Sequence, residues 1–150
     1  MDSFKRYFLH YFLIILAIAI VLVIIVKPHI SLKLLLLYFC VVLAVFVVPM
    51  SLLFSRQESV TTINIPCKDS DAVYTQIISI VESKTDRVLV RQDESASVFS
   101  TPASKVQLLT KYKRWLTNDI TVVKRASSVD VFIPQCYKKH FNNFIEETIE

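Results

Sequence analysis

The sequence predicts a membrane hairpin of two helices, followed by a small α+β domain with a mostly antiparallel sheet and two helices on one face. Two observations predict the hairpin: residues 7–26 and 34–54 are almost wholly apolar, and each run is long enough to cross a hydrocarbon core of roughly 30 Å. A third observation predicts the domain, because residues 59–150 alternate short β-branched runs with helical patterns. We therefore expect residues 1–58 to form the hairpin with its flank.

The first apolar run also has a feature of a cleaved leader, since Lys5 and Arg6 precede it. The one suitably spaced pair of small residues, Ala17 and Ala19, is followed by more apolar residues instead of a polar start. The beginning of the run also carries an aromatic belt typical of a membrane interface: Phe4, Tyr7, Phe8, Tyr11 and Phe12. We expect the run to remain as an anchor.

The two runs are separated by residues 26–33, VKPHISLK, in which Pro28 cannot continue a helix. So short a link makes the spans antiparallel neighbours and places both termini on one side. Three basic residues flank the terminal side and two lie in the loop, so the positive-inside rule puts the termini and the C-terminal domain in the cytoplasm. By analogy with small bacterial membrane proteins, we expect a bacterial inner membrane protein.

The domain begins with a strand at residues 60–66, ended by Pro66. An amphipathic helix follows over residues 68–84, with Asp69 among its capping candidates. Residues 87–92 and 97–101 then read as a hairpin.

Residues 105–116, KVQLLTKYKRWL, fit two structures. As a helix, they would place Val106, Leu109 and Leu116 on one side. As a strand, they would pair with residues 120–126 through a turn at Asn118 and Asp119, with Trp115 opposite Val122. The turn and the aromatic to β-branched pair favour the strand.

Residues 120–126 and 129–134 predict a further hairpin, which sets Arg125 across from Asp130 as an exposed ion pair. Residues 136–150 predict a closing helix. Residues 63–82 and 131–150 share a strand, proline and helix order with matching apolar positions. We therefore expect the two helices to lie side by side on one face of one sheet.

The chain contains no glycine, which excludes the phosphate-binding loop, the dinucleotide fingerprint and the nucleophile elbow. We expect no enzyme, no cofactor and no metal site. A thiol enzyme would need an activated Cys136, which shares a helix face with His140. Cys67 and Cys136 occupy comparable corners between a strand and a helix, so a pairing of these thiols stays open.

Basic and aromatic residues alternate at Lys111, Lys113, Arg114 and Trp115. Such a cluster can bind anionic lipid headgroups or nucleic acid, or it can form a solvated strand face with Trp115 in the core. Residues 1–58 hold five basic and two acidic side chains, against twelve and eleven in residues 59–150. Because the net charge of +4 comes mainly from the membrane flanks, nucleic acid is not an expected partner.

The closing helix has lysines near its start and glutamates near its end, against the helix dipole. Its aromatic face must therefore be held by packing, against the sheet or against another chain. The candidate partner-binding residues are Phe141, Phe144, Glu146 and Glu147.

These patterns favour a non-enzymatic, membrane-anchored interaction or accessory subunit. Its partners would be the lipid bilayer and another membrane protein or a second copy of the chain. The alternative is a ligand-sensing effector whose hairpin oligomerises to perturb the bilayer.

Overall fold

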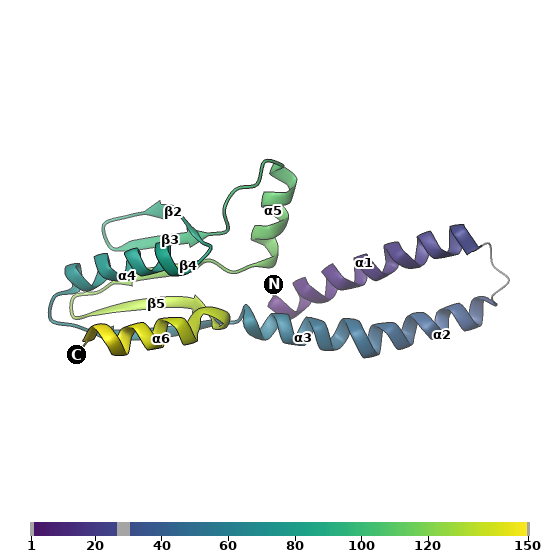
Figure 1. Ribbon diagram of the computed structural model, residues 1–150, viewed down its shortest axis with the longest axis horizontal. Helices are drawn as coiled ribbons and strands as arrows, with labels where there is room; N and C mark the ends of the chain where they lie inside the picture. Colours follow the sequence, from purple (N-terminus) through teal and green to yellow (C-terminus); the bar gives the residue numbers. More distant parts are fainter. Residues whose placement is uncertain (1, 27–30, 150) are drawn as a thin grey trace. The chain divides into compact units, whose positions relative to one another are not determined.

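The computed structural model describes residues 2–26 and 31–149, with the backbone alone at residues 26, 32, 140, 144 and 146–149. The chain divides into two compact units, Met1–Arg56 and Gln57–Glu150 (Figure 1). The predicted loop at Lys27, Pro28 and His29 lies outside the described residues.

The first unit is a hairpin of two long helices. Helix α1 spans Ser3–Val26, and the second helix is built from α2 (Leu32–Val42), the π-helical turn η1 (Leu43–Val47) and α3 (Val48–Gln57). Both helices are long and apolar enough to cross a membrane, by length and composition. The Ser31 hydroxyl caps α2 by accepting from the Leu34 N–H at 3.4 Å.

The π-helical turn ends two residues before Pro49, and the proline explains its position. Proline lacks an N–H and its ring clashes with the carbonyl four residues earlier. Widening the helix by one residue relieves that clash, and the Val48 N–H bonds the Leu43 carbonyl. The buried Ser51 hydroxyl donates to the Val47 carbonyl at 2.5 Å, which satisfies a backbone acceptor at the irregular turn.

The two helices of the hairpin run antiparallel, as the sequence predicts. Tyr7 stacks on Phe54 with ring centroids 5.8 Å apart, whereas Phe12 meets Phe39 edge-on at 6.0 Å. Nearer the loop, α1 and α2 enclose an apolar groove of about 710 Å³ that runs from Ile15 to Val42.

The second unit contains one antiparallel sheet of five strands in the order β1-β5-β4-β3-β2 (Figure 1). The strands are β1 (Val60–Pro66), β2 (Val88–Gln92), β3 (Ala96–Ser100), β4 (Ile120–Lys124) and β5 (Ser128–Pro134). The register pairs Ile63 with Val131, Val131 with Val122, and Val122 with Ser97. These side chains share one face because side chains alternate along each strand.

Helices α4 (Ser70–Lys84) and α6 (Gln135–Ile149) cover that face, and their apolar sides meet it in one core. The core holds Ile77 and Val81 of α4, Phe141 of α6 and Val131 of β5. This confirms the expected layer of two helices on a largely antiparallel sheet. Asp69 caps α4 by accepting from the backbone N–H groups of residues 71 and 72, both at 3.1 Å.

The antiparallel pairing of β1 with β5 separates the two cysteines that the sequence leaves as a candidate pair. Cys67 follows the end of β1 and bonds the Ser127 backbone, whereas Cys136 lies beside the start of β1, where the Gln135 N–H bonds the Ser59 carbonyl. A seven-residue strand spans roughly 20 Å. Both thiols are free, and they lie at opposite ends of the strand pair.

The prediction of a strand at residues 105–116 is wrong, because helix α5 forms at Gln107–Leu116. Trp115 therefore does not face Val122, which pairs with Ser97 and Val131. The predicted turn is also absent: Asn118 bonds Glu58 instead of closing a hairpin. Contacts of Thr110, Arg114 and Asn118 with other segments outweigh the local turn signal.

The second hairpin forms at β4 and β5, and Arg125 does pair with Asp130. The pair is exposed at one partner alone, since the Arg125 side chain is 63% accessible but that of Asp130 is 8%, with Val123 as its cross-strand neighbour. Asn64 of β1 also donates to the Asp130 carboxylate at 2.5 Å. Asp130 therefore joins three segments on the face of the sheet opposite the helices.

Candidate interaction surfaces

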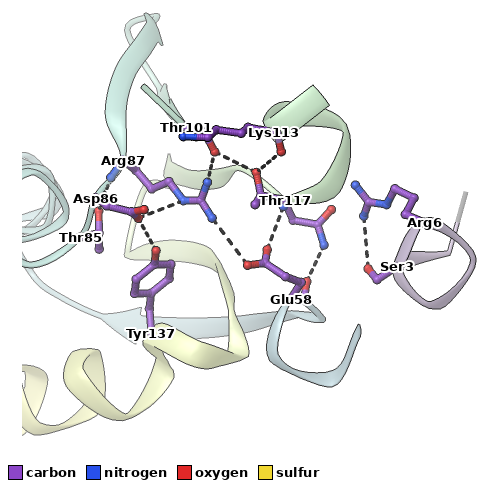
Figure 2. A network of polar contacts seen from close by, with 11 residues as sticks. Ser3, Arg6, Glu58, Thr85, Asp86, Arg87, Thr101, Lys113, Thr117 and Tyr137 are labelled. Carbon is purple, nitrogen blue, oxygen red and sulfur yellow. Dashed lines mark hydrogen bonds and ion pairs between the residues drawn. The ribbon is translucent and has the colours of Figure 1, made fainter. Parts of the chain in front are cut away.

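A buried arginine joins several segments at one end of the domain (Figure 2). Arg87 immediately precedes β2, and its side chain is 2% exposed. Its guanidinium donates to the Thr101 hydroxyl and lies 3.8 Å from the Glu58 carboxylate. Its Nε has no hydrogen-bond partner among the described residues, but it lies 3.6 Å from the Asp86 carboxylate. A buried charge needs such partners, so Arg87 fixes the start of β2.

The same cluster holds the end of α5. The Asn118 backbone N–H donates to Glu58 Oε2 at 3.0 Å, and the Asn118 side-chain amide donates to the Glu58 carbonyl at 2.5 Å. The hydroxyls of Thr101 and Thr117 are 2.8 Å apart (Figure 2). These contacts join the start of β1, the segment after β3 and the end of α5.

Tyr137 and Cys136 bring the start of α6 to this cluster. The Tyr137 hydroxyl donates to the Asp86 carboxylate, and burial together with that bond raises the Tyr137 pKa. Burial also raises the pKa of the Cys136 thiol, and nearby Glu58 adds to the effect. A raised pKa keeps the thiol protonated at neutral pH, which is the opposite of what a thiolate nucleophile requires.

Strand β2 is an exposed edge of the sheet. It pairs only with β3 among the described strands, and all five of its residues are exposed. Val88, Leu89 and Val90 are 43%, 37% and 50% accessible. Helix α4 packs mainly on β4 and β5. Three successive apolar residues therefore lie on this edge strand, with a β-bulge at Val90 where the register with β3 shifts.

Helix α5 is a second exposed surface, because none of its residues is buried. At about 100° per residue, its apolar side chains share an arc of about 120°. They are Leu108, Leu109, Tyr112, Trp115 and Leu116. Leu108 is 78% accessible, and Tyr112 stacks on Trp115 with centroids 6.0 Å apart.

The predicted membrane-surface residues all lie on α5. Lys111, Lys113 and Arg114 are all exposed, and Arg114 also donates to the Thr101 carbonyl at 3.4 Å, which ties it to the domain. Trp115 is half-buried rather than in the core. The structure therefore brings these residues together on a helix, where the sequence favoured a strand.

The predicted partner-binding residues lie on α6. Phe141 is 1% exposed and packs in the domain core, so the sheet is what holds this part of the aromatic face. The side chains of Phe144, Glu146 and Glu147 lie outside the described part of the helix. Their role as a partner surface stays a prediction.

Sequence reasoning did not single out Glu58 or Arg87, and it assigned Asn118 to a turn instead of to this cluster. Arg87 begins an apolar run, and an arginine at the start of a strand gives no sign of its burial. Asparagine at position 118 is typical of a turn, so its presence gave no sign of the bonds to Glu58. The cluster can be recognised only once the fold brings Glu58, Arg87 and Asn118 together.

Within residues 2–26 and 31–149, no three acidic, histidine or cysteine side chains gather in a way that could hold a metal ion. Comparison of the chain with protein-family models, curated proteins and solved structures gave no match. The interaction surfaces therefore rest on the geometry of this chain alone.

Proposed function

We propose that this protein is a membrane-anchored interaction subunit, in which two spanning helices hold an α+β domain that binds a partner protein of a membrane complex. The domain works on the cytoplasmic side of a bacterial inner membrane, and the protein has no catalytic role. The edge strand β2 accepts an extended segment of the partner, and the observation that carries this proposal is its exposed Val88-Leu89-Val90 sequence.

An edge strand offers a row of unpaired N–H and C=O groups to another strand. Sheet proteins commonly block such edges with charges, proline or β-bulges. On β2 the protection is limited to Arg91 and a bulge at Val90, where the register with β3 shifts. Arg91 is itself engaged with Asp93 at 2.9 Å. Strand addition obtains affinity from backbone hydrogen bonds and specificity from alternate side chains, and apolar residues on both faces of β2 suit it.

Membrane anchoring is supported by the exposure of the hairpin. The most apolar stretch is 0% buried in the first helix and 11% buried in the second. A core helix of a soluble protein would hide such a surface, whereas lipid covers it in a membrane. Three flanking basic residues, Lys5, Arg6 and Arg56, favour cytoplasmic termini.

A matched pair of variants tests the strand-addition surface. Val90 and Val60 are each 50% accessible, and they lie on the two opposite edge strands of the sheet. Val90→Lys should weaken partner binding about tenfold, since a lysine on an edge blocks pairing and an anchoring contact is worth roughly 1–2 kcal/mol. Val60→Lys should leave binding intact.

The full chain is extracted from native membranes in mild detergent, and the mass of the intact assembly is measured. A photo-crosslinking amino acid at position 90 or 60 then identifies what contacts each edge. We expect a second membrane protein linked from position 90 and not from 60. Crosslinking only to another copy of the chain would favour the bilayer-perturbing effector instead. Full binding by Val90→Lys would reject β2 as the partner surface.

A further inference from the structure

Helix α5 is attached to the domain by its polar side. The Thr110 hydroxyl accepts from the Ser104 backbone N–H at 2.7 Å, and Arg114 donates to the Thr101 carbonyl. Thr110 and Arg114 lie about 40° apart around the helix, opposite the apolar arc. This reverses the usual arrangement, in which a surface helix packs its apolar side on the core.

Most of the apolar side of α5 consequently faces outwards, while Trp115 and Leu116 at the end of the helix are half-buried. Leu108 is 78% accessible, Leu109 is 41% and Tyr112 is 38%. With Lys111 and Trp115, these residues line a shallow depression of about 700 Å³. A soluble protein rarely leaves such a continuous apolar surface open unless something binds it.

The charges around this surface identify the kind of partner. Residues 105–116 contain four basic side chains and no acidic one. Lys111 and Lys113 border the apolar arc on its two sides, about 40° beyond Trp115 and Leu109. Lysines in that position keep the ammonium group in the headgroup region while the alkyl chain follows the apolar surface. Tyr112 and Trp115 are the residue types that membrane interfaces favour.

The chain itself keeps α5 close to the proposed membrane. The second candidate span ends at Gln57, and the next residue, Glu58, accepts from the Asn118 N–H at 3.0 Å. Asn118 lies two residues after the end of α5. Consecutive Cα atoms are about 3.8 Å apart, so the end of α5 is held within a few residues' reach of the point where the chain leaves the span.

We propose that α5 lies in the plane of an anionic lipid surface, with its apolar arc among the upper acyl chains and its lysines among the phosphates. An amphipathic helix with a basic polar border and a Trp, Tyr and Leu face binds membranes in this way. The inference rests on the anchoring part of the proposed function. It gives the domain a second attachment to the membrane that fixes its orientation.

The chain offers a built-in probe, because Trp115 is its only tryptophan. The full chain is placed in nanodiscs of phosphatidylcholine, or of phosphatidylcholine and phosphatidylglycerol in equal parts. Quenching of Trp115 is measured with acrylamide in the water and with bromine on the lipid acyl chains. In anionic discs we expect strong quenching by the brominated lipid and weak quenching by acrylamide. In neutral discs we expect weaker quenching by the brominated lipid and stronger quenching by acrylamide.

Two variants separate the apolar and electrostatic contributions. Leu108→Ser should lower the ratio of docked to undocked helix roughly tenfold, by removing a large exposed apolar side chain. Its control is Gln107→Ser, an exposed change on the polar side. Lys111→Gln with Lys113→Gln should lower that ratio about fivefold for each lysine. The control is Lys138→Gln with Lys139→Gln, which removes two exposed charges from α6.

Retention of the chain by the discs in alkaline buffer is measured in the same samples. A chain that stays in the discs while Trp115 remains open to acrylamide overturns the lipid contact and leaves the anchoring intact. Protection from acrylamide without quenching by brominated lipid shows a protein covering α5, which also overturns the lipid contact. A chain that leaves the discs overturns the anchoring and this inference together.

Discussion

Asn118 bonds Glu58 twice, through its backbone N–H at 3.0 Å and through its side-chain amide. The two residues are 60 positions apart, and the bonds tie the end of α5 to the residue that follows the second helix of the hairpin. Glu58 also faces Arg87, which positions β2. One buried cluster thus fixes both exposed surfaces, the edge strand and the amphipathic helix, at the end of the domain where its chain begins.

Replacing Arg87 should destabilise the domain strongly. Arg87→Met leaves Glu58 without its buried cation, and breaking a buried pair from one side costs about 3–5 kcal/mol. Urea unfolding of the full chain in detergent micelles, followed by circular dichroism, measures the loss. The control is Arg91→Met, which removes an ion pair that is 72% and 53% exposed and should cost less than about 1 kcal/mol.

The double variant Glu58→Gln with Arg87→Met tests whether the pair is the cause. Glutamine has no charge to leave unpaired and still accepts from the Asn118 N–H, so the double variant should recover part of the lost free energy of unfolding. Equal losses from Arg87→Met and Arg91→Met would show that the buried cluster is not what stabilises this end of the domain.

A buried hydroxyl pair links α4 to β3. The Tyr74 hydroxyl and the Ser97 hydroxyl are 2.7 Å apart, and both residues are buried. Tyr74→Phe and Ser97→Ala should each cost about 1–2 kcal/mol, because each leaves one buried polar group unsatisfied. The double variant should cost clearly less than the sum, by about 0.5 kcal/mol or more, in the same unfolding assay. Strict additivity would contradict the bond.

The environment of Asp130 predicts a dependence of stability on acid pH. The hydrogen bond from Asn64, and then the bond and charge of Arg125, lower the Asp130 pKa from its ordinary value of 3.8. A lowered pKa in the folded state contributes stability that is present above the unfolded value and is lost as the pH falls through the folded value. The melting temperature of the native chain should therefore fall more steeply below about pH 4 than that of Asp130→Asn. Parallel curves for the two proteins would reject this assignment.

Much of the domain could be predicted because its signals are local. The proline that ends β1, the capping Asp69 and the apolar spacing of α4 each act within a few residues, and the structure has them where the sequence indicates. The pairing of two similar strand and helix units also predicted one sheet with both helices on the same face. Hydrophobic period and cap chemistry suffice for such elements.

The errors occur where long-range contacts decide. Residues 105–116 carry helical and strand signals together, and contacts outside the segment settle the choice. Thr110 and Arg114 bond the chain just before the helix, and Asn118 bonds Glu58, 60 positions away. The burial of Arg87 depends on Glu58, 29 positions earlier in the chain, which no local pattern reveals. The interaction surfaces depend on the helix at residues 105–116 and on the burial of Arg87. Sequence reasoning therefore found the residues of α5 but not their arrangement.

The sidedness of the domain can be tested through its exposed thiol. With Cys40→Ala and Cys67→Ser, Cys136 is the only cysteine, and it is exposed. A cytoplasmic domain predicts no reaction of Cys136 with a membrane-impermeant maleimide in intact cells, and reaction after permeabilisation. Because partial burial of the thiol raises the Cys136 pKa, less thiolate is present at neutral pH, and labelling should accelerate as the pH rises toward 8.5.

The matched control places a thiol at the opposite end of the hairpin. Ser31→Cys, in a chain that also carries Cys136→Ser and the two earlier changes, puts the thiol at an exposed residue beside the loop. If the termini are cytoplasmic, this thiol must react in intact cells, because the two antiparallel spans carry the loop across the membrane. Labelling of Cys136 and protection of position 31 would invert the orientation. The domain and α5 would then lie at the outer leaflet. The positive-inside rule, which concerns the cytoplasmic side, would not account for their lysines there.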